Sequence, residues 1–524
     1  MGIMKSLLSV STPEFERNRE AYAVRVADLH ARRAAATASS PATARNPPDE
    51  TKQLAPRERV SALLDPGSPF LELCQLAGEG PPEGLPPGAG LITGVGMVSG
   101  RPCMIIANDI SASGGSYNGI TCKVHVRAQR FAWQHRLPCI TLVQPGESDV
   151  DKQADVFPDD GQFGSIFYYQ MRMSRDGIAQ LASVHGPVAD SAAFVPALCD
   201  QLVIVRGQGA LAFGTAEAPP DFDAERYCRE SGTPDQLAES DAHAIAILRD
   251  IVANLGAPAR SRWDVAVPRE PLYDPREIHG IVSADPRIPT DNREIVLRLV
   301  DGSELQEFKP DYGETVITGF GRIKGYQVGI VCNNGVLFSE SAMKATNFIE
   351  LCCQRDIPLL FMVDINGFMV GREAEESGIA KHGSKMMTAM ACANVPKYTL
   401  TIGAAYGAGY LAMCGRVFAP NAMILWPNSR VAVMGSEQVA TTLAMIKDDQ
   451  HKREGTSWTN EEREAFKAPV RKMYETFANA YNFARNTWCD MIIDPAETRD
   501  VMALLLDLAG RVPAIPSRFG VYRM

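Results

Sequence analysis

The chain carries one pattern twice, and this internal repeat constrains the fold more than any other feature. Residues 96–108 read GMVSGRPCMIIAN, and residues 321–333 read GRIKGYQVGIVCN. Two glycines and an asparagine in each copy match at a constant offset of 225 residues: Gly96, Gly100 and Asn108 against Gly321, Gly325 and Asn333. Each copy continues through a lysine-bearing helical stretch into a second apolar strand. A duplicated β–α–β layer of this kind predicts two related domains.

Length and composition support that division. A chain of 524 residues exceeds what one core usually organises, and two domains of about 200–250 residues fit it. Alternating apolar runs and amphipathic stretches predict an α/β fold of β–α–β units with buried strands. We expect an N-terminal helix and flexible linker over 1–55, a first domain over 56–265 and a second over 266–524.

Charge and cysteine content argue against several function classes. A net charge of −10 disfavours nucleic acid or an anionic membrane as the main partner. The 12 cysteines are scattered without a C-x-x-C pair, so neither a disulfide framework nor a metal site is expected, and a reducing compartment is favoured. The N-terminal residues resemble neither a signal peptide nor an Arg-rich presequence. We therefore expect a cytoplasmic protein, or a mitochondrial matrix protein in a eukaryote.

The strongest candidate for chemistry follows a predicted strand at 398–402. Residues 403–410 read GAAYGAGY. Small residues at the start of a helix let backbone N–H groups approach a ligand and stabilise a developing oxyanion. Close packing of a helix against a strand explains the same residues equally well. Because we find no Ser–His–Asp set, P-loop or H-E-x-x-H motif, a backbone oxyanion site becomes the leading mechanism.

Two segments of the first half are weaker counterparts. Residues 186–194 (GPVADSAAF) keep small side chains but contain only one glycine, and Pro187 supplies no N–H. Residues 144–148 (QPGES) end another strand and, without further context, read as an ordinary turn.

Two glycine-rich loops could also contact ligands. Residues 364–371 (DINGFMVG) follow a strand at 359–363, and open α/β sheets bind ligands at the carboxyl ends of their strands. Residues 113–117 (SGGSY) precede a helix bearing Lys123, where glycines and a cation could hold a phosphate. A structural turn and solvated helix charges are the respective alternatives.

Together these segments resemble the carboxyltransferase (β) subunits of biotin-dependent acyl-CoA carboxylases, nearest to the 3-methylcrotonyl-CoA and geranyl-CoA enzymes. The second half carries the resemblance most densely, in TGFGRIKGYQVGIVCNNGVLFSESAMKATNFIELCCQRDIPLLF, NGFMVGRE, YGAGYLAMCGR and WPNSRVAVMGSEQ. The first half adds PRERVSALLDPGSPFLEL, RLPCI, QADVFPDDGQFG and VPALCD. The resemblance covers nearly the whole chain.

The resemblance implies a fold and an activity. The fold would be two crotonase-like domains of β-β-α units, produced by an internal duplication and assembled into a homo-oligomeric, usually hexameric, ring. The activity would be transfer of carboxylate from carboxybiotin to an acyl-CoA, with the thioester enolate held by backbone oxyanion holes and biotin itself removing the proton. A partner (α) subunit would supply biotin carboxylase and the biotin carrier, and no metal is implied in this chain.

Functional residues carry over from the resemblance by position. The two oxyanion holes would comprise Ala408 and Gly409 on the biotin side, and Gly146 with Glu147 on the thioester side. The acyl-CoA would contact Gly114, Gly115, Lys123, Ala192 and Ala193. Biotin-side contacts would come from Tyr406, Gly407, Phe368, Val370, Gly371 and Glu437.

Three departures from the family pattern fall in the acyl-CoA half. The family's S-G-G-A reads PGES at 145–148, so Glu147 replaces a glycine. A carboxylate there could repel an enolate, and a backbone angle natural to glycine is costly for other residues. The family's T-A-G-G-A-Y reads ADSAAF at 189–194, and the following segment at 211–220 is shortened.

These departures leave three hypotheses open. The chain is an active carboxyltransferase with an altered acyl pocket, or a non-catalytic or repurposed paralogue that acts as a scaffold subunit. The third alternative is an acyl-CoA decarboxylase, which would use the same enolate chemistry without a biotin partner. The sequence identifies neither the acyl group nor whether carboxylation occurs at the α or the γ carbon.

Overall fold

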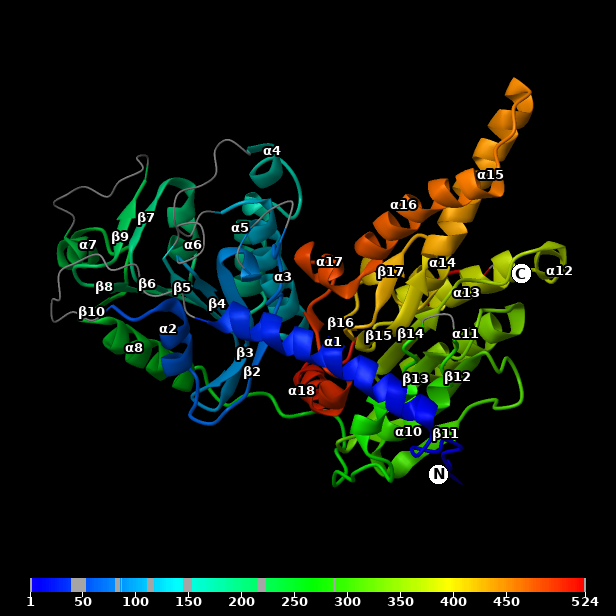
Figure 1. Ribbon diagram of the computed structural model, residues 1–524. Coiled ribbons are helices and arrows are strands. Elements are labelled where there is room, and N and C mark those ends of the chain that lie inside the picture. Colours follow the sequence, from blue (N-terminus) through cyan, green and yellow to red (C-terminus); the bar gives the residue numbers. More distant parts are fainter. Residues whose placement is uncertain are drawn as a thin grey trace. The chain divides into compact units, whose positions relative to one another are not determined.

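Each copy of the repeat builds its own β-sheet (Figure 1). The computed structural model describes residues 2–38, 53–80, 85, 87–110, 117–144, 153–213, 223–285 and 288–522. Unit 1 comprises residues 1–29, 262–483 and 492–524, and unit 2 comprises residues 30–261 and 484–491.

Unit 2 contains a seven-stranded sheet in the order β10-β8-β6-β5-β4-β3-β2. β2, β3 and β4 are antiparallel neighbours, whereas β4, β5, β6, β8 and β10 run parallel. The strands are β2 (Phe70–Leu73), β3 (Leu91–Val98), β4 (Arg101–Asn108), β5 (Cys139–Val143), β6 (Gln180–Val184), β8 (Gln201–Val205) and β10 (Gln236–Ala238), with the separate pair β7 (Pro187–Ala189) and β9 (Ala210–Ala212). The helices are α2 (Pro56–Leu63), η1 (Pro87–Gly90), α3 (Gly119–His135), α4 (Gln153–Val156), α5 (Phe163–Arg175), η4 (Asp190–Ala193), α6 (Phe194–Ala197), α7 (Ala224–Glu230) and α8 (Asp241–Ala253).

Unit 1 contains the larger sheet, in the order β1-β11-β12-β13-β14-β15-β16-β18, with β17 paired to β15. The strands are β1 (Gly2–Ile3), β11 (Glu304–Glu307), β12 (Val316–Ile323), β13 (Tyr326–Asn333), β14 (Leu359–Ile365), β15 (Lys397–Tyr406), β16 (Ala422–Leu425), β17 (Arg430–Ala432) and β18 (Met491–Ile492). The helices are η5 (Pro275–Glu277), α9 (Ile278–Ile281), α10 (Asn292–Leu299), η6 (Asp301–Ser303), α11 (Ser339–Gln354), α12 (Arg372–Glu376), α13 (Ile379–Cys392), α14 (Gly407–Ala412), η7 (Arg416–Phe418), α15 (Ser436–Glu454), α16 (Asn460–Ala478), η8 (Pro495–Glu497) and α18 (Thr498–Gly510). Two helices, α1 (Pro13–Thr37) and α17 (Ala480–Arg485), contribute residues to both units.

Strand register confirms the duplication that the sequence repeat predicts. In the β3–β4 hairpin Gly96 lies opposite Cys103, and in the β12–β13 hairpin Gly321 lies opposite Val328. The next pairs are parallel in both units, β4 with β5 and β13 with β14. The correspondence continues at the strand ends, because β7 pairs with β9 just as the end of β15 pairs with β17. The two units are therefore versions of one mixed α/β fold.

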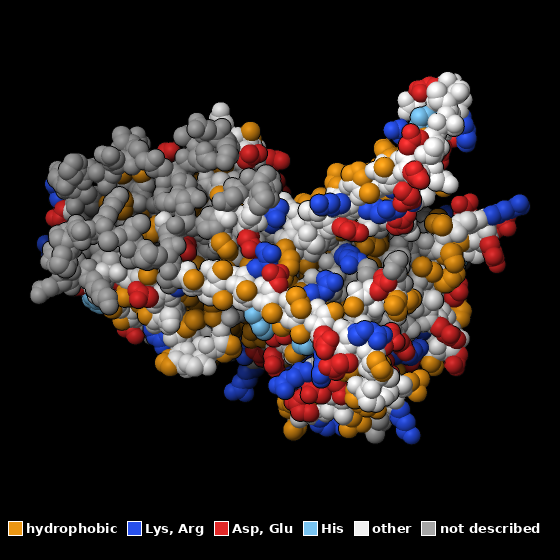
Figure 2. Space-filling model, in the orientation of Figure 1, with side chains coloured by type: hydrophobic (Ala, Val, Ile, Leu, Met, Phe, Trp, Pro, Cys, Tyr) orange, Lys and Arg blue, Asp and Glu red, His pale blue; other side chains and the backbone are white. Residues whose placement is uncertain are grey.

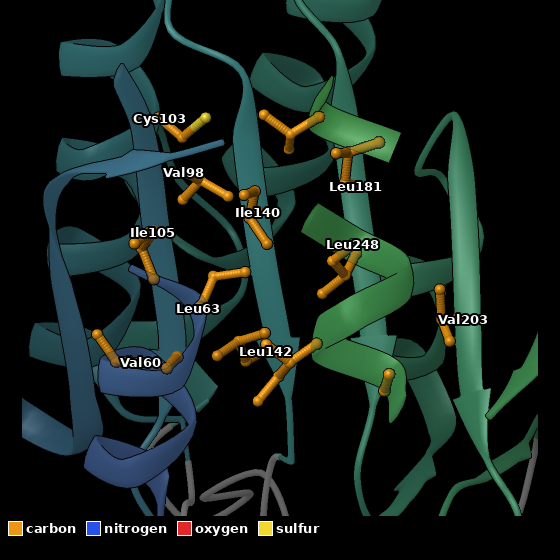
Figure 3. Close-up of a cluster of buried hydrophobic side chains, with 14 of the residues drawn as sticks. Val60, Leu63, Val98, Cys103, Ile105, Ile140, Leu142, Leu181, Val203 and Leu248 are labelled. Carbon is orange, nitrogen blue, oxygen red and sulfur yellow. The ribbon is translucent and has the colours of Figure 1, made fainter. Parts of the chain in front are cut away.

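The core of unit 2 explains the position of α2. Pro56 occupies the first turn of this helix, where the missing N–H costs no hydrogen bond. Val60 and Leu63, three residues apart on one face, are both buried. Figure 3 shows these side chains with Leu248 of α8 beside Ile140 and Leu142 of β5. Both helices thus pack on the sheet next to the end of β5.

The N-terminal helix expected within residues 1–55 is α1. Its buried residues in unit 1 are Phe15, Tyr22 and Leu29, spaced by seven residues and therefore on one stripe. Phe15 packs so closely on Gly280 that a Cβ there would lie 2.4 Å from its ring. The helix continues to Thr37, and residues 39–52, where most of the expected linker falls, lie outside the described residues.

The surface carries charges of both signs. Figure 2 shows acidic and basic side chains interspersed on the visible face. Among the helices that the structure describes, none has the length and apolarity needed to cross a bilayer.

Candidate active site

The turn between β15 and α14 is the best-formed candidate site. β15 ends at Tyr406, and α14 begins at Gly407 with a φ of +54°. A Cβ at Gly407 would lie 2.9 Å from the carbonyl oxygen of Val433, so both backbone angle and space favour glycine. The N–H groups of Ala408 and Gly409 belong to the first turn of α14, where helical N–H groups have no intrahelical partner. Ala408 is exposed, whereas Gly409 is buried.

The loop after β14 lies against this turn. A Cβ at Gly409 would lie 3.1 Å from the Cα of Gly367. Leu337 holds the loop from the other side, because its N–H donates to the Gly367 carbonyl at 3.1 Å and its carbonyl accepts from Met369 at 2.8 Å. Val370 is 84% exposed. The structure therefore brings the predicted loop next to the predicted turn.

Two other residues of that loop have different surroundings. The ring of Phe368 points to α13, where a Cβ at Gly383 would lie 2.9 Å from it. Gly371 has a φ of +117° and precedes α12. Phe368 thus anchors the loop, and the glycine angle allows the chain to turn into α12.

Asp364 fixes the strand that leads into the turn. Its Oδ1 accepts the N–H of Ala404 at 2.8 Å, and its own N–H donates to Oδ1 of Asn333 at 3.3 Å. A Cβ at Gly403 would lie 2.2 Å from the Asp364 carboxylate, so only glycine fits there. Burial raises the pKa of Asp364, although the Ala404 and Asn292 hydrogen bonds oppose the rise. The sequence analysis flagged this loop but missed the positioning role of its first residue.

Tyr406 connects the turn to the start of α15. A Cβ at Gly435 would lie 3.5 Å from its ring. Burial raises the pKa of Tyr406, which keeps the phenol protonated and able to donate a hydrogen bond.

Glu437 is engaged within the hairpin of α15 and α16. Its carboxylate accepts from Nζ of Lys467 at 2.5 Å and also from Arg471. Hydrogen bonds from Lys467 and then Arg471 lower the pKa of Glu437 to about 2. Its side chain therefore holds the first turn of α15 against α16.

The corresponding turn of unit 2 contains Ala192 and Ala193. Since Pro187 to Ala189 of β7 occupy the register of Ala404 to Tyr406 in β15, Asp190 corresponds to Gly407 and Ala192 to Gly409. Asp190 has a φ of +53°, nearly the same angle as Gly407. Both alanines are buried. The backbone path is therefore retained although the glycine is lost.

The remaining acyl-CoA candidates are less constrained. Lys123 is exposed in α3, a different element from the turn that holds Ala192 and Ala193. The candidates Gly114, Gly115, Gly146 and Glu147 lie outside the described residues, as does the shortened segment after Phe213.

The structure also brings together a Ser–His–Asp set that the sequence analysis did not find. Ser183 Oγ lies 2.7 Å from Nε2 of His185, whose Nδ1 lies 2.8 Å from Oδ1 of Asp241. All three residues are completely buried. Because a nucleophilic serine must reach its substrate, this arrangement serves as internal structure. Its members come from β6, its following residue and the start of α8, so no sequence spacing reveals it.

The two matching sheets define a duplicated crotonase-like protein, whose best-formed candidate site is the turn at 406–409. The carboxyl transferase domain family model matches residues 49–519. The beta1 subunit of the biotin-dependent 3-methylcrotonyl-coenzyme A carboxylase of Mycobacterium tuberculosis is 48% identical over 95% of this chain and 96% of its own length. The mitochondrial methylcrotonoyl-CoA carboxylase beta chain of Arabidopsis thaliana is 47% identical over 90% of this chain and 83% of its own length.

A solved structure agrees with these relatives. The beta subunit of P. aeruginosa geranyl-CoA carboxylase superposes with a TM-score of 0.89 at 36% identity, over 99% of both chains. The chain belongs to the carboxyl transferase domain family, among the beta subunits of biotin-dependent acyl-CoA carboxylases.

Proposed function

We propose that this chain is the carboxyltransferase subunit of an acyl-CoA carboxylase that acts on an enoyl thioester such as 3-methylcrotonyl-CoA. The observation that carries the proposal is the turn at Gly407, where backbone angle and space both favour glycine and exposed Ala408 follows. The names of its relatives support the choice of thioester.

The second domain, residues 266–524, would take the biotin side. Biotin supplies the carboxyl group when bound, and its ureido oxygen suits N–H groups such as those of Ala408 and Gly409. The exposed side chain of Val370 fits the apolar part of that ring. Tyr406, Gly407, Phe368 and Gly371 would shape this side, and Glu437 would act indirectly by holding α15.

The first domain, residues 56–265, would take the acyl-CoA side. N–H groups near Ala192 and Ala193 would orient the thioester oxygen, together with Gly146 and Glu147. Lys123, Gly114 and Gly115 would contact the coenzyme A portion. The bond between the biotin ureido nitrogen and the carboxyl carbon would break to release CO2, and that nitrogen would take the proton from the acyl carbon. The resulting enolate would form the new bond to the CO2 carbon while backbone N–H groups hold its oxygen.

We further propose that the chain forms a homo-oligomer, a hexamer in its complete state, with a biotin-carrying α subunit as partner. It would work in the cytoplasm of a bacterium, or in the mitochondrial matrix of a eukaryote; the name of the Arabidopsis relative calls that protein mitochondrial.

The test is carboxylation of 3-methylcrotonyl-CoA by the complex with its biotin-carrying partner, followed with labelled bicarbonate. We expect turnover by the native complex and a loss of about 100-fold in kcat for Gly407→Ala, because displaced oxyanion donors cost roughly that much. Gly455→Ala is the matched control, since Gly455 also has positive φ (+68°) but nothing lies near its Cβ position. If the partner carboxylates biotin while the native complex carboxylates no acyl-CoA, the chain is a scaffold subunit.

A further inference from the structure

Five buried polar side chains meet at the carboxyl ends of β5 and β6 in unit 2. Asp241, at the start of α8, accepts from Nε of Arg59 at 2.9 Å and lies beside His185 as described above. Arg59 also donates from Nη1 to Oε1 of Gln144 at 2.5 Å. The set, here called the strand-end network, consists of Arg59, Gln144, Ser183, His185 and Asp241, each at most 7% exposed.

The charges of the network balance. Burial would raise the pKa of Asp241, but the hydrogen bond from His185 and the charge of Arg59 outweigh it and lower that pKa. Burial lowers the pKa of His185, so its ring is neutral near pH 7. One guanidinium therefore faces one carboxylate. The same guanidinium also donates a hydrogen bond to the side-chain amide oxygen of Gln144.

The network fixes the ends of two neighbouring strands. The Gln144 N–H donates to Oδ1 of Asn108 at 3.1 Å, and the His185 carbonyl accepts from Gln53 at 2.9 Å. A Cβ at Gly186 would lie 2.8 Å from Cγ of Gln144, so the Gln144 side chain forms the surface on which the β6–β7 connection rests. That connection leads directly into the turn with Ala192 and Ala193.

In unit 1 a different side chain supports the connection that leads into the corresponding turn. There Asp364, near the end of β14, corresponds in register to Gln144, which follows β5, and it packs on Gly403 as Gln144 packs on Gly186. Asp364 accepts the Ala404 N–H, but the corresponding residue of unit 2 is Pro187, which has no N–H to donate. An amide replaces the carboxylate in unit 2, and the donor to its oxygen is Arg59.

We propose that Arg59 and Gln144 are positioning residues for the thioester half of the reaction, doing for the turn at 187–193 what Asp364 does for the turn at 406–409. Arg59 holds Gln144 in one orientation, and Gln144 in turn sets where the β6–β7 connection passes. Asp241, which also bonds His185, orients the Arg59 guanidinium. This inference rests on the proposed function only for its kinetic consequence.

The test compares two substitutions of Gln144 in the complete complex. Gln144→Met keeps the length but removes the oxygen, whereas Gln144→Glu keeps an oxygen for Arg59. Arg57→Met is the matched control, because Arg57 lies on the same helix and pairs with Glu72 outside the network. We expect Gln144→Met to lower kcat for the acyl-CoA about tenfold with KM within twofold, since a misplaced reacting group costs rate rather than affinity. Gln144→Glu should recover at least a third of the native kcat, and Arg57→Met should match the native complex.

Hydrogen exchange of residues 187–197 supplies a readout that does not need turnover. Gln144→Met should exchange there at least tenfold faster than the native complex and Arg57→Met. Native kinetics and native exchange in Gln144→Met would overturn the proposal, as would a lower Tm with unchanged kcat per folded subunit. If the native complex carboxylates no thioester, the proposed function fails, and exchange at 187–197 alone decides on positioning.

Discussion

At the residue scale, the two turns place different side chains on the same left-handed backbone. Gly407 and Asp190 have φ values of +54° and +53° at corresponding positions. A side chain in this region costs about 1 kcal/mol or more, and Asp tolerates it better than most residues. Asp190 can therefore adopt the backbone angle that Gly407 adopts, so the turn of the first domain has the same backbone angle there as the turn of the second.

A glycine exchange measures this cost directly. We expect Gly455→Ala to lower the free energy of unfolding by about 1 kcal/mol through φ alone. Gly407→Ala should cost about 2–3 kcal/mol, because its Cβ also meets the Val433 carbonyl. Asp190→Gly should change stability by less than about 1 kcal/mol, since relief of strain offsets added freedom in the unfolded chain. Urea unfolding of the three variants gives these values, and equal losses for both alanine variants would contradict the steric argument.

At the element scale, Tyr22 of α1 makes both a ring contact and a hydrogen bond within unit 1. The Tyr22 ring stacks on His279 with centroids 5.2 Å apart, and its hydroxyl donates to Asn428 at 2.6 Å. The Asn428 amide in turn donates to the Ile402 carbonyl at 2.8 Å, within the strand that leads to the turn at 406–409. The N-terminal helix thereby supports the candidate site from outside it.

Two substitutions separate the contributions of ring and hydroxyl. Tyr22→Phe should cost about 1 kcal/mol through the lost hydrogen bond. Tyr22→Ala should cost about 3–5 kcal/mol, because it also leaves a cavity under α1. Chemical unfolding measures both values, and limited proteolysis should release the N-terminal segment sooner in Tyr22→Ala. Similar losses for the two variants would show that the hydroxyl, and not the packed ring, attaches the helix.

The strands and the duplication were largely predictable from the sequence, whereas contacts between residues far apart in the chain were not. The glycine–asparagine repeat and the alternating apolar runs revealed the duplication, because strand register follows local pattern. The pairing of 186–194 with 403–410 was predicted, but the left-handed backbone angle that Asp190 shares with Gly407 was missed, since such an angle at aspartate leaves no clear sequence signal. The His185–Asp241 and Arg59–Asp241 pairs join residues 56 and 182 positions apart, so only the assembled sheet brings them together.

At the scale of the whole molecule, the two units differ in their buried histidines. His125, His135 and His185 are buried in unit 2, and no buried histidine occurs among the described residues of unit 1. Burial lowers the pKa of His125 to about 3 and that of His135 to about 4, and it lowers that of His185 as well. Folding of unit 2 therefore requires all three rings to be neutral.

This difference predicts that unit 2 is the more acid-sensitive unit. At about pH 8 and above, well above the ordinary histidine pKa of about 6.5, these rings are neutral in both folded and unfolded chains, so they cause no pH dependence there. As the pH falls through about 6.5, the unfolded chain takes up protons that folded His125 and His135 refuse until about pH 3–4, and each of these two rings costs up to about 1.4 kcal/mol per pH unit. His185 acts in the same direction. Hydrogen exchange at pH 7 and pH 5, compared at matched intrinsic rates, should show loss of protection in unit 2 before unit 1. His125→Gln should reduce the loss of protection between pH 7 and pH 5 by the contribution of one of the three rings. An unchanged pH dependence in this variant would show that buried His125 does not cause the acid sensitivity.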